Sequence, residues 1–484
     1  MRQRVLAAFL GSLLAYTGIA QAWAGPGPLN LPNIGDPSEL AMSPQQARLL
    51  GEAFMRNVRQ TQHVIDDPEI NAYIQSLGHR LAYASNDPSQ PFTFFVIQDA
   101  QINAFAGPGG YIGVNSGLIR ATQSESELAA VLSHEIAHVV QHHLARAFAA
   151  AQKLSLPTAA ALLAGILIGT RNSEAGAAAI SAGLAGSAQY QINFTRADEE
   201  EADRVGMQIL ERSGFDPMAM PRFFQRLEQT ARYYNQIPPY LADHPVTVAR
   251  IADATNRAAQ YPHHPVKSSM AYLLTRAKLR VITTRDPSEA ADYFKAKLGG
   301  SHGRRRAAAR YGYVLALTAA SDYRTARAQL QKLLATDSER NAYQIALAHV
   351  DLGEGQVTQS LAVYVHALKL YPYNAPLTLY YAQTLIQTSQ PQKALQVLHA
   401  FLRHHKPNAT AYQLLARAAG DAGRTVEAHQ ALAEHYYLNG QTHAAIEQLN
   451  IALRSTPITQ YQSAQIKARL KQFKTEAALE AKLH

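Results

Sequence analysis

The 484-residue sequence contains no cysteine, which removes several classes of site at once. Thiolate zinc sites, iron–sulfur ligation, a cysteine nucleophile and disulfide bonds are all excluded. Long apolar runs are scarce too: the stretches at 5–20 and 154–169 are both short for a membrane-spanning helix. Any metal site in this chain must therefore use histidine and carboxylate ligands.

Charged residues make up only 17% of the chain, and they are unevenly distributed. Residues 1–269 carry a net charge of −3, whereas residues 270–484 carry +12. A basic C-terminal half indicates an acidic partner, which can be a protein, a lipid headgroup or a nucleic acid. Its one compact basic run, 304–306, is too short to favour nucleic acid, so we predict no nucleic-acid partner. The length and the hydrophobic content of 47% fit a folded chain of two or three domains.

The N-terminus has the pattern of a cleaved secretory signal. Residues 1–4 carry two arginines, 5–20 are apolar, and two Ala-x-Ala sites follow. We predict cleavage after Ala22 or Ala24, with an uncleaved membrane anchor as the alternative. Trp23 is the only tryptophan, so cleavage after Ala24 leaves a mature protein without tryptophan fluorescence.

Aromatic and β-branched residues predict a small β-sheet. Residues 92–97 form the first strand, and 102–105 and 111–115 are the next two candidates. Glycines before the third candidate permit close backbone approach. We therefore predict an edge strand that pairs with an extended peptide substrate, entered through Gly109, Gly110 and Tyr111. An ordinary hairpin turn at these glycines is the alternative.

The most informative stretch is 133–138, where His134, Glu135 and His138 form the pattern His-Glu-x-x-His in a run with helical periodicity. Two imidazoles four residues apart lie on one helix face, close enough to bind one metal ion. The glutamate beside them can act as a general base on a water molecule that the metal activates. Because the short pattern also occurs by chance in unrelated helices, a third ligand is needed to support it.

Two further histidines, His142 and His143, follow one turn later. A metzincin would place its third histidine six residues after His138, but that position is Leu144, and Gln141 replaces the expected glycine. The third ligand must therefore come from elsewhere. We assign His142 and His143 to solvent or to support of the metal ligands.

The acidic stretch at 194–206 offers that third ligand. On a helix, Glu199 and Asp203 share a face, and Arg196 lies one turn before Glu199. This arrangement suits a carboxylate ligand, an aspartate that orients a ligating imidazole, and an arginine that steadies both carboxylates. A solvated acidic face is the alternative, and it would be preferred if the upstream histidines were absent.

These motifs, with Asn103-Ala-Phe-Ala-x-Pro-Gly-Gly before a strand, occur in the order found in the M48 family of zinc metallopeptidases. Residues 40–260 resemble that family, a group of gluzincins whose third ligand is a glutamate. The resemblance implies one Zn²⁺ per chain, held by His134, His138 and Glu199. It also implies that Glu135 is the general base and that Asp203 supports the ligands. Gly107 and Thr195 depart mildly from the family pattern, and neither is a ligand position.

The stretch Asp243-His244-Pro245, followed by Arg250, closes this region, and the family often has a His-Pro with a downstream arginine there. A zinc ion with three protein ligands keeps one position open. Our hypothesis is that His244 either occupies that position in a resting state or contacts the reacting oxygen, with Arg250 supporting the site. A histidine that only packs a loop is the alternative.

Residues 154–188 lie between the two metal motifs and are almost wholly apolar or small. We predict a buried or interfacial helical hairpin that covers the site. Peripheral contact of this hairpin with a membrane is a further expectation.

From Met270 onward the sequence changes to Ala-rich helices with short turns. Equivalent helix ends at Asp337, Pro372 and Pro407 recur every 35 residues, close to the tetratricopeptide (TPR) period of about 34. Stacked helix pairs form a concave groove for a segment of another protein. Here the groove is expected to be basic and tyrosine-bearing, with packing roles as the alternative for the candidates Tyr364, Tyr380 and Tyr381.

The predicted fold is mainly α: a gluzincin-type α+β metallopeptidase domain with a small sheet, then an all-α TPR solenoid. The predicted divisions are 1–24 for the signal peptide, 25–265 for the peptidase and 270–484 for the repeats. As a whole the chain resembles periplasmic M48 proteases of Gram-negative bacteria that aid outer-membrane β-barrel assembly.

That resemblance implies a periplasmic endopeptidase in quality control of outer-membrane proteins. Its repeats would bind unfolded or stalled outer-membrane proteins and the β-barrel assembly machinery. The competing interpretation is a TPR chaperone or scaffold whose protease site is latent or gated. A nucleic-acid role is a third and weaker one, since a secretory N-terminus disfavours it.

Overall fold

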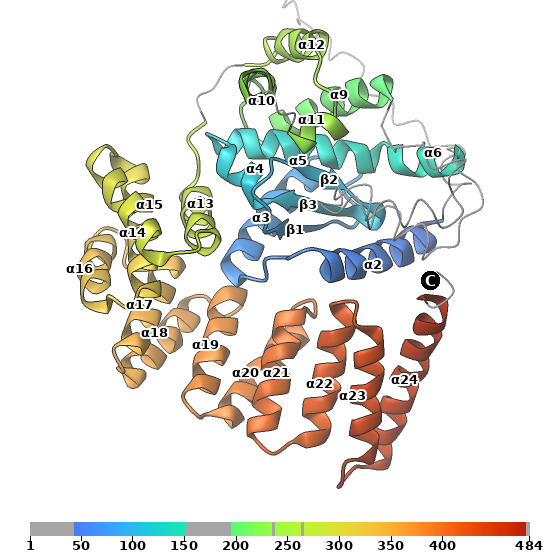
Figure 1. The fold of residues 1–484 in the computed structure, drawn as a ribbon, viewed down its shortest axis with the longest axis vertical. Coiled ribbons are helices and arrows are strands. Elements are labelled where there is room, and N and C mark those ends of the chain that lie inside the picture. The colour runs from blue at the N-terminus through green and yellow to red at the C-terminus, as the bar shows by residue number, and fades with distance from the viewer. Residues whose placement is uncertain (1–42, 151–194, 235–237, 263–265, 481–484) are drawn as a thin grey trace, which may run out of the picture.

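The computed structural model describes residues 43–150, 195–234, 238–262 and 266–480. The predicted signal peptide and the 154–188 hairpin lie outside these residues. Over the described residues the chain is mainly helical with one small sheet, as the sequence predicts. Figure 1 shows the sheet and its helices above a curved row of paired helices. None of the described helices is both long and apolar enough to cross a membrane.

The sheet has three strands in the order β1-β3-β2. β1 (Thr93–Ile97) runs parallel to β3 (Tyr111–Asn115), and β2 (Ala104–Ala106) runs antiparallel to β3. The central strand is therefore β3, and the prediction that it is a substrate-binding edge is wrong. The reason lies in the turn η1 (Pro108–Gly110), where positive φ angles of 68° at Gly109 and 77° at Gly110 fold the chain into an ordinary hairpin.

Helices cover both faces of the sheet and bury its apolar side chains. Phe94 of β1 packs on α3 (Pro68–Tyr83), which comes so close that a Cβ at Gly78 would lie 2.4 Å from the Phe94 ring. The remaining helices of this part are α2 (Pro44–Thr61), α4 (Ser116–Ala121), α5 (Glu125–Val140), α6 (His143–Ala150), α9 (Arg196–Arg212), α10 (Ala219–Tyr234), α11 (Pro239–Asp243) and α12 (Val248–Ala258). Helix α5 is the central one, because all its residues from Glu125 to His138 are buried.

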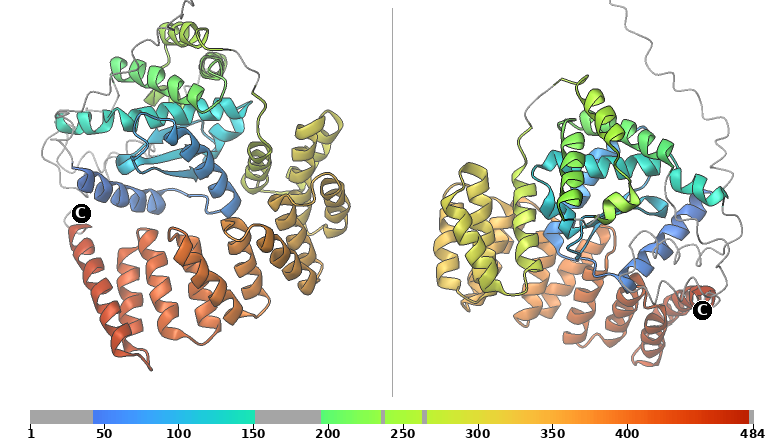
Figure 2. Two further views of the ribbon diagram at one scale, coloured as in Figure 1. Left: turned by 180° about the vertical axis from the view of Figure 1, so that it is seen from behind. Right: turned by 45° about the horizontal axis from the view of Figure 1, so that its top comes forward.

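The second part is a row of antiparallel helix pairs. Its helices are α13 (Met270–Thr283), α14 (Pro287–Gly299), α15 (Gly303–Ala319), α16 (Tyr323–Leu334), α17 (Asn341–Gly353), α18 (Val357–Leu370), α19 (Ala375–Gln387), α20 (Pro391–His404), α21 (Ala409–Asp421), α22 (Thr425–Leu438), α23 (Thr442–Arg454) and α24 (Gln460–Glu480). Helices α16, α18 and α20 end within three residues of Asp337, Pro372 and Pro407, so the predicted repeat is confirmed. The row curves around the sheet-containing part in both views of Figure 2.

Two of the three tyrosines expected to line the groove do not do so. Tyr364 is fully buried and Tyr380 is 8% exposed, while Tyr381 is half-buried. The hydroxyl of Tyr380 donates a 2.7 Å hydrogen bond to Asp67, just before α3. The groove prediction is wrong for both. Tyr364 packs inside the solenoid against Ile345 and Leu377. Tyr380 packs beside it and contacts the first part through Asp67.

Helix α2 joins the two parts at the far end of the solenoid. The Arg56 guanidinium donates a 3.1 Å hydrogen bond to the Tyr437 hydroxyl and forms a 3.4 Å ion pair with Glu476. Gln60 donates to the carbonyl oxygen of Gly440, in the turn between α22 and α23. A Cβ at Gly440 would lie 2.6 Å from the Arg56 carbonyl oxygen, so glycine permits this close approach.

This junction predicts a difference between two similar glycines. Gly440 and Gly423 both have a positive φ, 77° and 72°, but only Gly440 has a neighbour within 4 Å of an added Cβ. Replacement by alanine strains the backbone at both positions, and only Gly440→Ala also overpacks the junction. We expect Gly440→Ala to be less stable than Gly423→Ala by about 1–3 kcal/mol in urea unfolding. Equal losses of stability in the two variants would show that α2 does not constrain the turn at Gly440.

Candidate metal centre

Helix α5 places His134 and His138 on one buried face. Their ring centroids lie 4.6 Å apart, and their Nε2 atoms are 3.0 Å from each other. Helix α9 crosses close to this turn, because a Cβ at Gly206 would lie 3.0 Å from the His134 backbone. The glycine therefore lets α9 bring its acidic residues up to the two histidines.

The carboxylate of Glu199 meets both rings. Its Oε2 lies 3.5 Å from His134 Nε2, and its Oε1 lies 3.5 Å from His138 Nε2. His244, directly after α11, completes the group: its Nδ1 is 2.8 Å from Glu199 Oε1 and 3.4 Å from His134 Nε2. One ligand atom from each of these four buried residues lies within 4.8 Å of all the others.

These distances fit a zinc ion. Zinc is bound by imidazole nitrogen and carboxylate oxygen at about 2.0–2.2 Å in a tetrahedron, so neighbouring ligand atoms are about 3.3–3.5 Å apart. The distances between ligand atoms within the group are 2.8–3.5 Å, close to that spacing. Without an ion, this arrangement would bring ring nitrogens together in a buried space, so the donor set suits a metal better than it suits packing.

A second pair of residues steadies the ligands from behind. Asp203 Oδ1 lies 3.0 Å from His134 Nδ1, and the Arg250 guanidinium donates to both oxygens of Asp203 at 2.8 and 2.9 Å. Arg250 also lies 2.9 Å from Glu199 Oε2. Burial opposes the charged forms, but the hydrogen bonds prevail: they raise the pKa of His134 to about 10 and hold the pKa of Asp203 below its usual value.

The side chain of Glu135 is fully buried beside the ligand group. Neither carboxylate oxygen accepts a hydrogen bond from the described part of the chain, and the nearest ring nitrogen, His244 Nε2, is 3.6 Å from Oε1. Burial raises the pKa of the Glu135 carboxyl. A carboxylate with a raised pKa and free lone pairs can accept a proton from a reacting water.

Around the metal centre, the structure departs from the sequence expectations in two places. Arg196 is exposed and makes no ion pair with Glu199 or Asp203 in the described residues, so its predicted steadying role is wrong. Because α9 begins at Arg196, this side chain lies at the exposed end of the helix, and Arg250 takes the role instead.

The second departure concerns the predicted substrate-binding strand. Gly109 and Gly110 pack against Ala47 and Pro91. The segment just before β2 is instead hydrogen-bonded to α11, the helix that ends directly before His244. The Asn103 amide donates to Asp243 at 3.1 Å, and the backbone N–H of Tyr240 donates to the Ile102 carbonyl oxygen at 3.1 Å. The sequence motif that begins at Asn103 carried this signal, but the strand order needed to interpret it did not follow from the sequence.

Comparison with known proteins agrees with this geometry. The model of peptidase family M48 matches residues 68–258, and a tetratricopeptide-repeat model matches 351–418. The β-barrel assembly-enhancing protease of Yersinia pestis is 36% identical over 444 residues, 92% of this chain and 91% of that one. The protein of the same name from Escherichia coli K12 is also 36% identical, with the same shares covered.

A more distant relative covers a smaller share of the chain. The mitochondrial metalloendopeptidase OMA1 of Schizosaccharomyces pombe is 27% identical over 186 residues, 37% of this chain and 50% of that one. The identity and coverage of the two bacterial relatives are decisive. The chain belongs to peptidase family M48, and within it to the family of β-barrel assembly-enhancing proteases.

Proposed function

We propose that this M48 zinc metallopeptidase is a periplasmic endopeptidase that acts in the quality control and assembly of outer-membrane β-barrel proteins. The observation that carries the proposal is the buried group of His134, His138, Glu199 and His244 beside Glu135, whose carboxylate accepts no hydrogen bond from the described residues. The names of the relatives support the biological role. The predicted secretory signal supports the location.

We assign zinc to His134, His138 and Glu199. The bound metal supplies Lewis-acid activation of water and of the scissile carbonyl. Asp203 accepts the Nδ1 proton of His134, which leaves Nε2 free for the metal. Glu135 takes a proton from the attacking water on a carboxylate oxygen and passes it to the leaving amine.

We propose the outer edge of β2 as the place where an extended substrate binds. Within the described residues β2 pairs with β3 alone, so its other edge offers backbone groups to a peptide. The hydrogen bonds of Asn103 and Ile102, just before β2, to α11 support this proposal, since α11 ends directly before His244.

We propose His244 as a gate. Its ring lies within the ligand group and packs on Tyr240 at a centroid distance of 5.0 Å. With zinc bound, it would take the position that the reacting water needs. We expect His244→Ala to raise the rate of peptide cleavage several-fold while zinc content stays at one per chain. A fall in the cleavage rate at full zinc content would instead assign His244 to catalysis. An unchanged rate would contradict the proposal that His244 is a gate.

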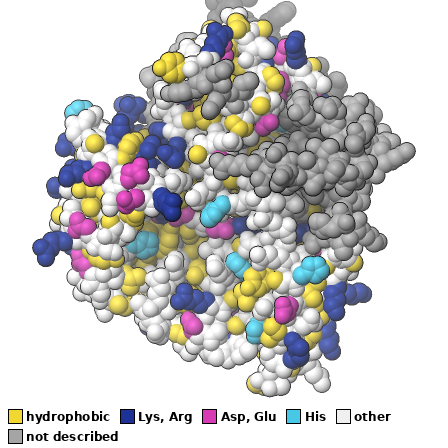
Figure 3. Space-filling model, in the orientation of Figure 1, with side chains coloured by type: hydrophobic (Ala, Val, Ile, Leu, Met, Phe, Trp, Pro, Cys, Tyr) yellow, Lys and Arg dark blue, Asp and Glu magenta, His cyan; other side chains and the backbone are white. Residues whose placement is uncertain are grey.

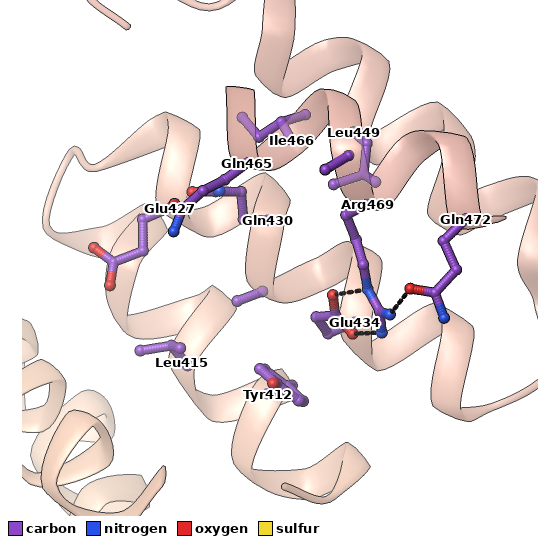
Figure 4. A pocket seen from close by; sticks show the side chains of 12 residues that line it. Tyr412, Leu415, Glu427, Gln430, Glu434, Leu449, Gln465, Ile466, Arg469 and Gln472 are labelled. Atoms are coloured by element: carbon purple, nitrogen blue, oxygen red, sulfur yellow. Dashed lines mark hydrogen bonds and ion pairs between the residues drawn. The ribbon is translucent and has the colours of Figure 1, made fainter. Parts of the chain in front are cut away.

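We propose the repeats as the partner-binding part, with boundaries of 25–265 for the peptidase and 270–484 for the TPR domain. Lys and Arg side chains gather over α13–α16, at the left of Figure 3. A cavity of about 580 Å³ lies between helices α21–α24, lined by Tyr412, Leu415, Glu427, Glu434, Arg469 and neighbouring residues. Figure 4 shows Arg469 paired with Glu434 inside it, so this cavity is not uniformly basic.

The partners we propose are unfolded or stalled outer-membrane proteins and the β-barrel assembly machinery. Membrane contact by 154–188 remains a prediction, since those residues lie outside the described part. The absence of a nucleic-acid partner also stays a prediction.

A metal analysis with a casein cleavage assay tests the proposal on the mature protein. We expect one zinc per chain, loss of cleavage after treatment with a strong chelator, and recovery when zinc is added back. Zinc at about 100 times its Kd should also stabilise the folded chain by about 2.7 kcal/mol. Cleavage that survives complete removal of zinc would contradict the assignment.

A further inference from the structure

His143 is buried although it lies at the junction of two helices. The chain turns at His142, whose φ of 54° is in the left-handed region, and α6 begins at the next residue. This turn directs the ring of His143 back toward α5. Its Nδ1 lies 2.8 Å from Nδ1 of His138, and its side chain has no exposed surface.

The distance fixes which nitrogen of each ring carries a proton. His138 turns its Nε2 to the ligand group, so when this nitrogen binds zinc the proton is on Nδ1. His143 must then accept at Nδ1 and carry its own proton on Nε2. That nitrogen faces Glu201 Oε2 at 3.3 Å and Asp198 Oδ1 at 3.8 Å, two carboxylates that can accept it.

A third group holds these carboxylates in place. The Arg146 guanidinium lies 2.8 Å from Asp198 Oδ1 and 3.4 Å from Glu201 Oε2. The partners of His143 are thus gathered on its far side from His138. The two ligating histidines are then supported differently: His134 by Asp203 directly, and His138 through a second imidazole.

We propose that His143 is a positioning residue that holds the His138 ring through its Nδ1 proton and thereby sets the affinity for zinc. The proposal rests on the assignment of zinc to His138. Loss of such an outer partner typically weakens metal binding by about 10- to 100-fold. A histidine that only filled space would leave zinc affinity unchanged when replaced by a side chain of similar size.

Two substitutions separate these roles. Leucine at 143 fills much of the same space and cannot accept a hydrogen bond, whereas asparagine presents an oxygen near the position of the histidine Nδ1. We expect His143→Leu to weaken zinc binding by about 10- to 100-fold, and His143→Asn to recover most of it. The readouts are zinc Kd by competition with a chromogenic chelator and the visible spectrum of the Co²⁺ form.

The neighbouring residue is the matched control. In the described residues the His142 ring has no hydrogen bond to a metal ligand, and asparagine tolerates a positive φ. His142→Asn should therefore bind zinc as tightly as the wild type. If His143→Leu does not fold, the double variant Asp198→Ala/Glu201→Ala is the substitute, because it removes the acceptors of the His143 Nε2 proton. This double variant is also expected to weaken zinc binding.

The outcomes are distinguishable from those that test the function itself. A wild-type chain that binds no zinc would defeat the proposed function. If the wild type binds zinc and His143→Leu, or the double variant in its place, binds it equally tightly, the function stands and the role of His143 is overturned. Equal losses in His143→Leu and His143→Asn would also overturn it, since the acceptor would then not matter.

Discussion

Replacement of Glu135 by Gln is expected to lower kcat for peptide cleavage by roughly two to four orders of magnitude, the usual contribution of a general base. The amide has the same shape as the carboxylate but cannot take a proton from water. Glu135 is fully buried, and its oxygens accept no hydrogen bond from the described residues, so little structure depends on its charge. Zinc content and thermal stability should therefore stay close to those of the wild type.

Glu200→Gln is the matched control, because Glu200 is exposed on α9 next to the proposed ligand Glu199. It should leave the cleavage rate unchanged. A Glu135→Gln variant that retains the wild-type rate with one zinc bound would remove Glu135 from the mechanism. The same variant separates enzyme from scaffold in cells: full rescue of outer-membrane defects by an inactive protein would make partner binding the primary role.

Local spacing explains why the centre of the site was predictable. His134 and His138 are one helical turn apart, so their juxtaposition follows from helix geometry alone. Glu199 and Asp203 obey the same rule on α9. The resemblance to a known family supplied the prediction that residues of both helices bind one metal ion. The 35-residue recurrence of helix ends predicted the solenoid for a similar reason, since each repeat contacts mainly its neighbours.

The errors all concern contacts between distant segments. Gly109 and Gly110 suit either an edge strand or a hairpin, and only the pairing of β3 with both β1 and β2 decides between them. Arg196 and Arg250 are equally plausible in sequence, but only Arg250 lies on the buried side of the ligands. Tyr380 fits a groove position by sequence, and only its contact with Asp67 before α3 shows that it is buried.

The contact between α3 and the solenoid contains a buried lysine whose removal should have the largest effect on stability. Lys278 on α13 is 8% exposed, and its Nζ lies 2.8 Å from Asp67 and 2.5 Å from Glu69. The ammonium also donates a 2.8 Å hydrogen bond to the Tyr380 hydroxyl of α19. One cation thus balances two carboxylates where the peptidase part meets the repeats.

The two carboxylates respond differently to this shared cation. Burial opposes ionisation of both. Lys278 and Tyr380 nevertheless hold the pKa of Asp67 below its usual value, whereas burial together with repulsion from Asp67 keeps the pKa of Glu69 raised. Lys278 favours the ionised form of both carboxyl groups.

We expect Lys278→Met to lower the free energy of unfolding by about 3–5 kcal/mol, because two buried carboxylates lose their counter-charge. Lys295→Met, at an exposed position on α14, is the control and should cost little. Adding Asp67→Asn and Glu69→Gln to Lys278→Met should recover much of the loss, since no buried charge remains. Urea unfolding measures all of these variants.

The pH dependence gives a second test of the same cluster. Without Lys278, we expect burial to raise the pKa of both carboxyl groups in the folded state. Their protonated forms then favour folding at low pH, and this support is lost as pH rises through the raised pKa values. In the wild type, the contribution of Asp67, whose pKa is lowered, is present at neutral pH and lost on acidification. Both trends should reduce the difference in the free energy of unfolding between Lys278→Met and the wild type as pH falls toward about 4, the pKa of carboxyl groups in an unfolded chain. A difference that stays constant with pH would mean that the charge of Lys278 is not what joins the solenoid to α3.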